Sequence, residues 1–224
     1  MNAELSARGF EHLHLWRRGV DLQRFHPRPP HGELAALPRP IMAYVGRLAV
    51  EKNLDAFLGL AVPGTKLVIG DGPQRAELVA RHTDVVFAGY RFGDELASML
   101  ATADVLVFPS LTDTFGLAMI EALACGVPVA AFPVPGPVDV IEQGVTGVLH
   151  EDLAVAVRSA LLLDRRVCAQ RAAAFTWDAA TAQFFAGLEP IPQALRATLA
   201  VRRSSVIIAR ILARMQASGT GDAN

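Results

Sequence analysis

The sequence predicts an α/β fold, a single Rossmann-like domain whose mainly parallel sheet of about six strands is covered by helices on both faces. Short apolar runs, typical of strands buried on both faces, recur along the chain and alternate with segments of helical spacing. This alternation indicates parallel pairing, because parallel neighbours in a sheet need a crossover segment between them. The expected strands are residues 41–45, 66–69, 85–87, 105–108, 127–130 and 147–149.

Composition places the chain among soluble globular proteins with one large core. Of its 224 residues 52% are apolar, and 14 Pro and 18 Gly indicate many turns. Cys125 and Cys168 are far apart and lack metal-ligand spacing, which suits a reducing compartment and gives no sign of a disulfide framework or a metal site. The sequence contains no spanning apolar stretch and no signal-peptide core, so we expect a cytoplasmic protein.

Three segments can be distinguished along the chain. Residues 1–40 include a helical pattern at 4–10, an alternating stretch at 12–16 that resembles a strand, and then a linker rich in Pro, His and Gly. Residues 41–188 carry the alternating strands and helices. Residues 189–224 form a tail in which apolar residues line one helical side against arginines, a basic amphipathic pattern.

Asp113 and Glu121 are the most informative residues, eight positions apart around a helix start that follows the strand at 105–108. Ligands of open α/β sheets gather outside the carboxyl ends of the strands, where amide donors at helix starts meet phosphate or hydroxyl oxygens. Gly116 would let the backbone approach such a ligand closely. The arrangement suits a polyhydroxylated ligand. The alternative is that Asp113 only caps the helix and Glu121 is a solvated helix residue.

Basic side chains are expected at the same edge of the sheet. Arg47 follows the first strand and Lys52 lies at the next helix start, and right-handed crossovers bring such loops to one cleft. A guanidinium fork and an ammonium group both suit phosphate oxygens. Arg47 could instead pair with Glu51 at the surface. The histidines have no metal-like spacing, so we expect structural or solvated roles for them.

Five parts of the sequence carry a family resemblance. They are Arg18-Gly19-Val20-Asp21 with Arg24-Phe25-His26-Pro27, Val45-Gly46-Arg47-Leu48 with Glu51-Lys52-Asn53, Ile69-Gly70-Asp71-Gly72-Pro73, Phe87-Ala88-Gly89, and Asp113 to Glu121 continuing to Val129. Together they resemble the nucleotide-sugar half of a retaining glycosyltransferase with the two-domain GT-B architecture, in the large family 4 group. The similarity covers residues 4 to 188.

The resemblance implies a role for each site residue. Asp113 and Glu121 are the expected catalytic pair, with Asp113 on the transferred sugar and Glu121 on the ribose hydroxyls, although family members usually carry Glu where this chain has Asp113. Arg47 and Lys52 take the diphosphate in place of a metal, so no metal or cofactor is expected and the donor is a UDP-sugar or GDP-sugar. The expected substrate-binding set is completed by Gly46, Thr114, Phe115, Gly116 and Leu117, with Tyr90 and Arg91 on the base side.

The same resemblance implies a hexosyltransferase module rather than a whole enzyme. Residues 1–40 would be the remnant of the acceptor domain with its linker, residues 41–188 the donor domain, and a separate chain could supply the acceptor half. We therefore expect poor transfer by the chain alone. The tail at 189–224 indicates peripheral attachment to the anionic inner face of a membrane and a lipid or glycan acceptor. A tail helix packed on the domain or on a partner is the alternative.

Other functions are compatible with the residues to different degrees. A truncated homologue that holds a nucleotide sugar without catalysis, as a regulatory module, is the main alternative. A sugar epimerase of related architecture fits the segment from Asp113 to Glu121 less well. A dinucleotide oxidoreductase is disfavoured because no Gly-x-Gly-x-x-Gly follows the first strand, and no nucleic-acid partner is expected. The residues leave the base, the sugar and the acceptor open.

Overall fold

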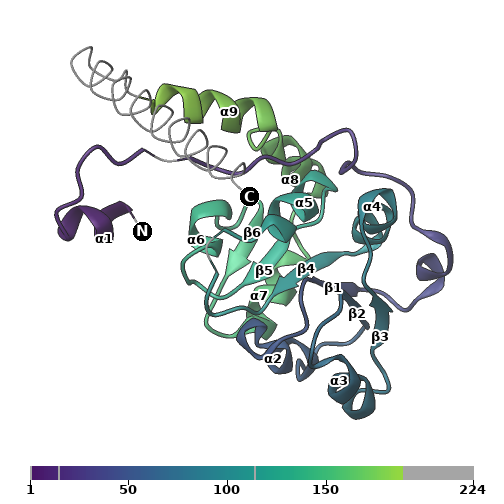
Figure 1. Ribbon diagram of the computed structural model, residues 1–224. Helices are drawn as coiled ribbons and strands as arrows, with labels where there is room; N and C mark the ends of the chain where they lie inside the picture. The colour runs from purple at the N-terminus through teal and green to yellow at the C-terminus, as the bar shows by residue number, and fades with distance from the viewer. Residues whose placement is uncertain (1, 15, 114, 189–224) are drawn as a thin grey trace, which may run out of the picture. The chain divides into compact units, whose positions relative to one another are not determined.

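The computed structural model describes residues 2–14, 16–113 and 115–188 (Figure 1). Contacts divide the chain into two units, Met1–Phe184 and Phe185–Asn224. The first unit contains the whole sheet, and the tail predicted at 189–224 lies outside the described residues. None of the helices in the described residues combines the length and the hydrophobicity of a transmembrane span.

Six parallel strands form one sheet in the order β3-β2-β1-β4-β5-β6, which confirms the predicted fold class. Because β1 and β4 are neighbours, the connections run outward in opposite directions from this pair, which makes the β1–β4 junction the topological switch point of a doubly wound sheet. The carboxyl ends of these two strands are where a crevice is expected. The strands are β1 (Ile41–Val45), β2 (Thr65–Ile69), β3 (Val86–Gly89), β4 (Val105–Phe108), β5 (Val129–Ala131) and β6 (Gly147–Leu149).

Helices cover both faces of the sheet. Strand side chains alternate between two buried clusters, so that Ile41 and Ala43 of β1 face one layer while Met42 and Tyr44 face the other. Helices α4, α5 and α8 pack on the first cluster, and α2, α3 and α7 on the second (Figure 1). The helices are α1 (Asn2–Ala7), α2 (Leu54–Leu58), α3 (Arg75–Arg81), α4 (Gly93–Thr102), α5 (Leu117–Ala124), α6 (Pro137–Val140), α7 (Leu153–Ala160), α8 (Arg165–Ala172) and α9 (Trp177–Ala186), with 3-10 turns η1 (Gly32–Ala36) and η2 (Val50–Lys52).

The segment before the sheet differs from its prediction. Helix α1 forms where a helix was expected, but no strand forms in the described residues of 12–16. An alternating pattern forms a strand only when it has a neighbour to pair with. The backbone pairs instead at one isolated bridge between Val20 and Thr176, which ties the segment to the start of α9.

Candidate functional site

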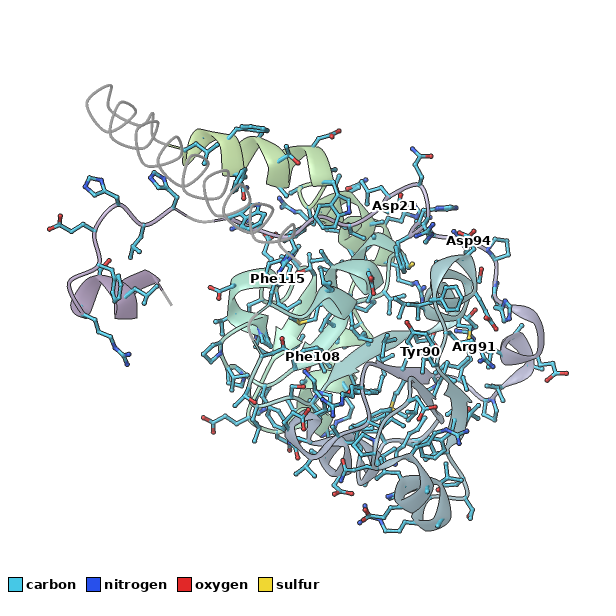
Figure 2. All side chains as sticks on the ribbon, in the orientation of Figure 1. Asp21, Tyr90, Arg91, Asp94, Phe108 and Phe115 are labelled. Carbon is cyan, nitrogen blue, oxygen red and sulfur yellow. The ribbon has the colours of Figure 1, made fainter. Side chains whose placement is uncertain are left out.

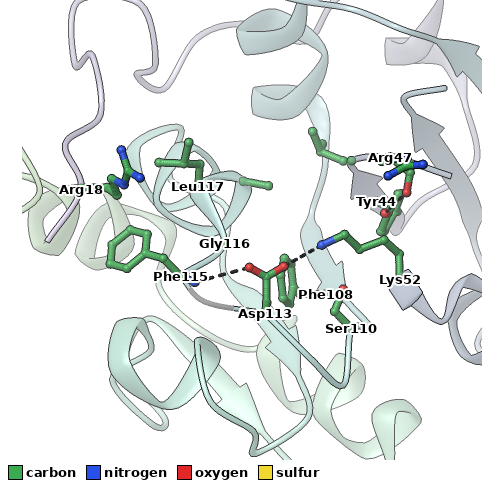
Figure 3. A pocket seen from close by; sticks show the side chains of 13 residues that line it. Arg18, Tyr44, Arg47, Lys52, Phe108, Ser110, Asp113, Phe115, Gly116 and Leu117 are labelled. Carbon is green, nitrogen blue, oxygen red and sulfur yellow. Dashed lines mark hydrogen bonds and ion pairs between the residues drawn. The ribbon is translucent and has the colours of Figure 1, made fainter. Parts of the chain in front are cut away.

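Two adjoining pockets open at the carboxyl ends of β1 and β4. The first has a volume of about 400 Å³ and lies between the loop after β1 and the loop after β4 (Figure 3). The second has a volume of about 520 Å³ and extends from β1 across the ends of β2 and β3. Val45, Gly46 and Arg47 line both. The site is therefore one elongated cleft with Arg47 at its middle.

The first pocket contains an ion pair between two predicted site residues. Lys52 Nζ donates to Asp113 Oδ2 across a distance of 2.8 Å, with 26% and 15% of the two side chains exposed. Asp113 Oδ1 also accepts from the amide of Phe115 at 3.4 Å (Figure 3). The residue that precedes α5 is Gly116, with φ +76°, so Asp113 does not cap that helix. An ammonium group and a carboxylate side by side offer both donors and acceptors to a ligand.

The backbone of Arg47 is fixed by a hydrogen bond, whereas its side chain is largely exposed. The buried Tyr44 hydroxyl donates to the Arg47 carbonyl at 2.8 Å, and a Cβ on Gly46 would lie 2.8 Å from that hydroxyl oxygen, so glycine is required there. Burial, and then the carboxylates of Asp113 and Glu51, raise the pKa of Tyr44 and keep it a donor. The Arg47 side chain is 67% exposed, 3.7 Å from Glu51. The predicted surface pair with Glu51 thus exists, although Glu51 itself lines neither pocket.

Glu121 lies in the second pocket. It is the fifth residue of α5 and is half-buried, which excludes the alternative of a fully solvated helix residue. Burial raises the pKa of its carboxyl group. Throughout the described residues, no hydrogen bond or ion pair joins its side chain to another group. An unsatisfied carboxylate can accept two hydrogen bonds from a vicinal diol.

Aromatic side chains line the far end of the second pocket. Tyr90 and Phe92 follow β3 with 67% and 71% exposure, and their ring centroids lie 6.0 Å apart. Arg91 Nε lies 2.8 Å from Glu95 Oε1. In Figure 2, Tyr90 and Arg91 lie beside one another, away from Phe108 and Phe115 of the first pocket. Exposed aromatic rings beside a cation suit a planar heterocycle.

The predicted site residues lie at the same edge of the sheet, at the carboxyl ends of the strands, but they are divided between the two pockets. Lys52 and Asp113 lie in the first, Glu121 in the second, and Arg47 in both. Gly46 also lines both pockets, Phe115, Gly116 and Leu117 line the first, and Tyr90 and Arg91 line the second. Thr114 lies outside the described residues.

Several lining residues were not predicted as site residues. Ser110 is 1% exposed, and its Oγ has no hydrogen-bond partner although the residue lines the first pocket. Arg18 lines the first pocket and Arg24 the second. Both arginines belong to segments that carried the family resemblance, which was the available signal. In the described residues no three His, Cys, Asp or Glu side chains cluster closely enough to hold a metal ion.

Comparison with known proteins identifies the family. Residues 39–162 match the family described as Glycosyl transferases group 1. The chain belongs to this family. A GDP-mannose-dependent alpha-mannosyltransferase of Mycobacterium tuberculosis is 42% identical over 151 residues, which are 65% of this chain and 40% of that protein.

Two further curated relatives extend the similarity along the chain. A GDP-mannose-dependent alpha-(1-6)-phosphatidylinositol dimannoside mannosyltransferase of Mycobacterium tuberculosis is 38% identical over 192 residues, 76% of this chain and 50% of that protein. The sulfoquinovosyl transferase SQD2 of Arabidopsis thaliana is 34% identical over 195 residues, 75% of this chain and 38% of that protein. The chain therefore spans half or less of the length of these relatives.

Solved structures show the same fold. Sucrose-phosphate synthase from Thermosynechococcus elongatus is 27% identical with a TM-score of 0.62, over 82% of this chain and 52% of that chain. The lipopolysaccharide outer core galactosyltransferase WaaB has a TM-score of 0.69 at 19% identity, over 83% of this chain and 58% of that one. Family and fold confirm the predicted resemblance to the C-terminal half of a GT-B glycosyltransferase.

Proposed function

We propose that the chain is the donor-binding half of a retaining glycosyltransferase that moves a hexose from a nucleoside diphosphate sugar. The observation that carries the proposal is the order in which aromatic, acidic and basic side chains follow one another along the cleft. Aromatic rings stand at one end, an unsatisfied carboxylate and an exposed guanidinium follow, and an ammonium–carboxylate pair stands at the other end. A base, a ribose, a diphosphate and a sugar follow one another in the same order.

Each group of the donor has a partner of suitable chemistry in this arrangement. The base lies against Tyr90 and Phe92, and the ribose diol donates to Glu121. Arg47 and Lys52 receive the diphosphate, whose outer phosphate gains negative charge as the bond to the sugar breaks. Asp113 accepts from a sugar hydroxyl in the first pocket. With two cations on the leaving group, the proposed transfer uses no metal.

The base we favour is guanine, with mannose as the sugar. The support is that two of the relatives described above, at 42% and 38% identity, are named as GDP-mannose-dependent enzymes. A protein from Anabaena with a similar fold was solved in complex with UDP. It is 19% identical with a TM-score of 0.61, over 76% of this chain and 56% of that chain, so the similarity supports the fold and does not identify the base. UDP is therefore the comparison ligand of choice.

Thermal shift with GDP, UDP and ADP tests donor binding. A ligand held by the native state increases the free energy of unfolding by mass action, by about 2.7 kcal/mol at 100 times its Kd, and so raises the melting temperature. Arg47→Ala should reduce the shift. Arg81→Ala is the matched control, because Arg81 also pairs with a glutamate one helical turn away, Glu77, but lies outside both pockets. The proposal is refuted if none of the three diphosphates at millimolar concentration stabilises the protein.

Transfer and its acceptor are proposed for the whole protein. One relative is named for a phosphatidylinositol dimannoside, which favours a lipid acceptor. The chain is incubated with GDP-mannose and a phosphatidylinositol mannoside, alone and together with a separate chain that supplies the acceptor half, and the product is analysed by NMR. We expect product with both chains present and little with this chain alone. A retaining enzyme gives the anomeric configuration of the donor, and an inverted product would contradict the proposed stereochemistry.

A further inference from the structure

Lys52 is the last residue of a short turn that needs an unusual backbone angle to end. The 3-10 turn η2 covers Val50–Lys52, and the next residue, Asn53, has φ +53° and ψ +42°. Asn53 donates its amide to the Val50 carbonyl at 3.0 Å and is followed directly by α2. The left-handed region costs most residues about 1–2 kcal/mol, and asparagine tolerates it better than other side chains. Asn53 therefore fixes the direction in which the chain leaves Lys52.

The side chain of Asn53 reaches the other loop of the first pocket. Its Nδ2 donates to the carbonyl of Pro109, a buried residue directly after β4, at 3.1 Å. Because the acceptor is a carbonyl oxygen, the nitrogen side of the amide must face it. Lys52 and Asn53 thus bind the loop after β4 at two points, Asp113 and Pro109.

Only one of these two neighbours lines the pocket. Lys52 does, whereas Asn53 lies outside the lining of both pockets. A lysine side chain is a flexible four-carbon stem that ends in three rotatable donors, so its ammonium group is well placed only if its backbone is. With one donor directed to Asp113, the others remain for a ligand.

We propose that Asn53 is a positioning residue for recognition of the diphosphate. It acts through Lys52 by joining the loop after β1 to the loop after β4 and by ending the turn that carries the ammonium group. The inference rests on the proposed function. A purely structural role for Asn53 would change stability and weaken all ligands alike, whereas positioning of Lys52 changes affinity only for the part of the ligand that Lys52 contacts.

Calorimetric titration of the full chain with GDP and with guanosine separates these roles. If UDP binds more tightly, UDP and uridine are used. Asn53→Gly allows the same backbone angle and removes the side-chain amide. We expect it to weaken diphosphate binding about five- to tenfold, while nucleoside affinity changes less than about twofold. Asn53→Asp keeps the shape but cannot donate to Pro109, and serves if the glycine variant does not fold.

A double-mutant cycle with Lys52→Ala completes the test. In the Lys52→Ala background, Asn53→Gly should change diphosphate affinity less than about twofold, because the group it positions has been removed. Additive losses, or equal weakening of diphosphate and nucleoside, would overturn the inference and leave the proposed function intact. Wild-type protein that binds no diphosphate would overturn both.

Discussion

The two ends of the sheet carry similar charged clusters around cavities of similar size. At the amino ends of β1, β4 and β5, Arg39, Asp104 and Arg165 line a cavity of about 480 Å³. At the carboxyl ends, Arg47, Lys52 and Asp113 line one of about 400 Å³. Arg18 also lines the cavity at the carboxyl ends, so each cavity combines two or three basic side chains with one carboxylate. Neither the kinds of charged group nor the cavity volume distinguishes the two ends. The difference is in what the polar groups contact.

Hydrogen bonds within the fold engage the cluster at the amino ends. Arg165 donates to the carbonyls of Ala103 and Ala101 at 2.6 and 2.9 Å, and Arg39 donates to that of Thr102 at 3.2 Å. These carbonyls lie at the end of α4, where a helix leaves acceptors unpaired and its dipole favours cations. Asp104 accepts from Arg39 and from the amide of Ile41. The cluster is a helix cap, which explains it without a ligand.

Several polar side chains at the carboxyl ends of the strands lack hydrogen-bond partners within the described part of the domain or are largely exposed. Glu121 has no partner among the described residues, the Ser110 hydroxyl is buried without one, and Arg47 projects with 67% of its side chain exposed. A buried polar group without a hydrogen bond costs about 1–3 kcal/mol, so its presence needs a reason outside the folding of the domain. A ligand that supplies the missing partners is such a reason.

The largest expected effect is on stability, from removing the cap. Arg165→Met keeps much of the side-chain volume but leaves two carbonyls without their donors. We expect a loss of about 2–3 kcal/mol, which lowers the melting temperature by about 5–10 °C in a chain of this size. Calorimetry measures the loss, and nucleotide affinity should stay unchanged. Weakened nucleotide binding in a folded Arg165→Met protein would show that the two ends are coupled.

For Lys52→Ala we expect the larger effect on diphosphate affinity and the smaller effect on stability. Loss of a charged donor to phosphate costs about 1.5–2 kcal/mol, so diphosphate affinity should fall roughly 10- to 30-fold. Because Asp113 loses its partner at 2.8 Å, a smaller loss of stability should accompany the change. Titration at two salt concentrations checks the charge, since the difference from wild type should shrink at high salt. An unchanged affinity would remove Lys52 from the site.

The sequence predicts the fold and the edge of the sheet at which the site forms. Continuous apolar runs identify every strand, with small shifts such as β5, which begins at Val129 because Pro128 has no amide hydrogen to donate. Right-handed crossovers then place the residues after β1 and β4 together. Arg47, Lys52, Asp113 and Glu121 could be assigned to one edge on this basis.

The division into two pockets could not be predicted. The division depends on the directions in which the side chains point. Glu121 lies one turn into α5 and lines the second pocket, near the end of β2. Asp113 precedes the helix and faces Lys52 in the first pocket. Tyr44 was missed because its place in an apolar strand is that of a core residue. Its hydroxyl nevertheless had to find an acceptor, which is the backbone of Arg47.

The smallest effect is expected for Glu121→Gln, and it has opposite signs for stability and binding. Burial raises the folded-state pKa above its ordinary value of 4.5, so the charged carboxylate destabilises the fold at neutral pH. As the pH falls through the raised pKa to about 4.5, the wild type binds a proton and this cost disappears. Glutamine carries no charge. The variant should therefore be more stable than the wild type at pH 7, with the difference vanishing near pH 4.5.

Binding should change the other way. An amide oxygen accepts more weakly than a carboxylate, and we expect nucleoside diphosphate affinity at pH 7 to fall about five- to tenfold. Glu77→Gln is the control, because Glu77 is exposed on α3, outside both pockets, and should leave ligand affinity unchanged. If Glu121→Gln lowered stability at pH 7, the carboxylate of Glu121 would be stabilised by contacts within the domain, as that of Asp104 is. The two ends of the sheet would then not differ in the way proposed. A gain in stability with a loss of affinity is the combination expected of a charge retained for a ligand.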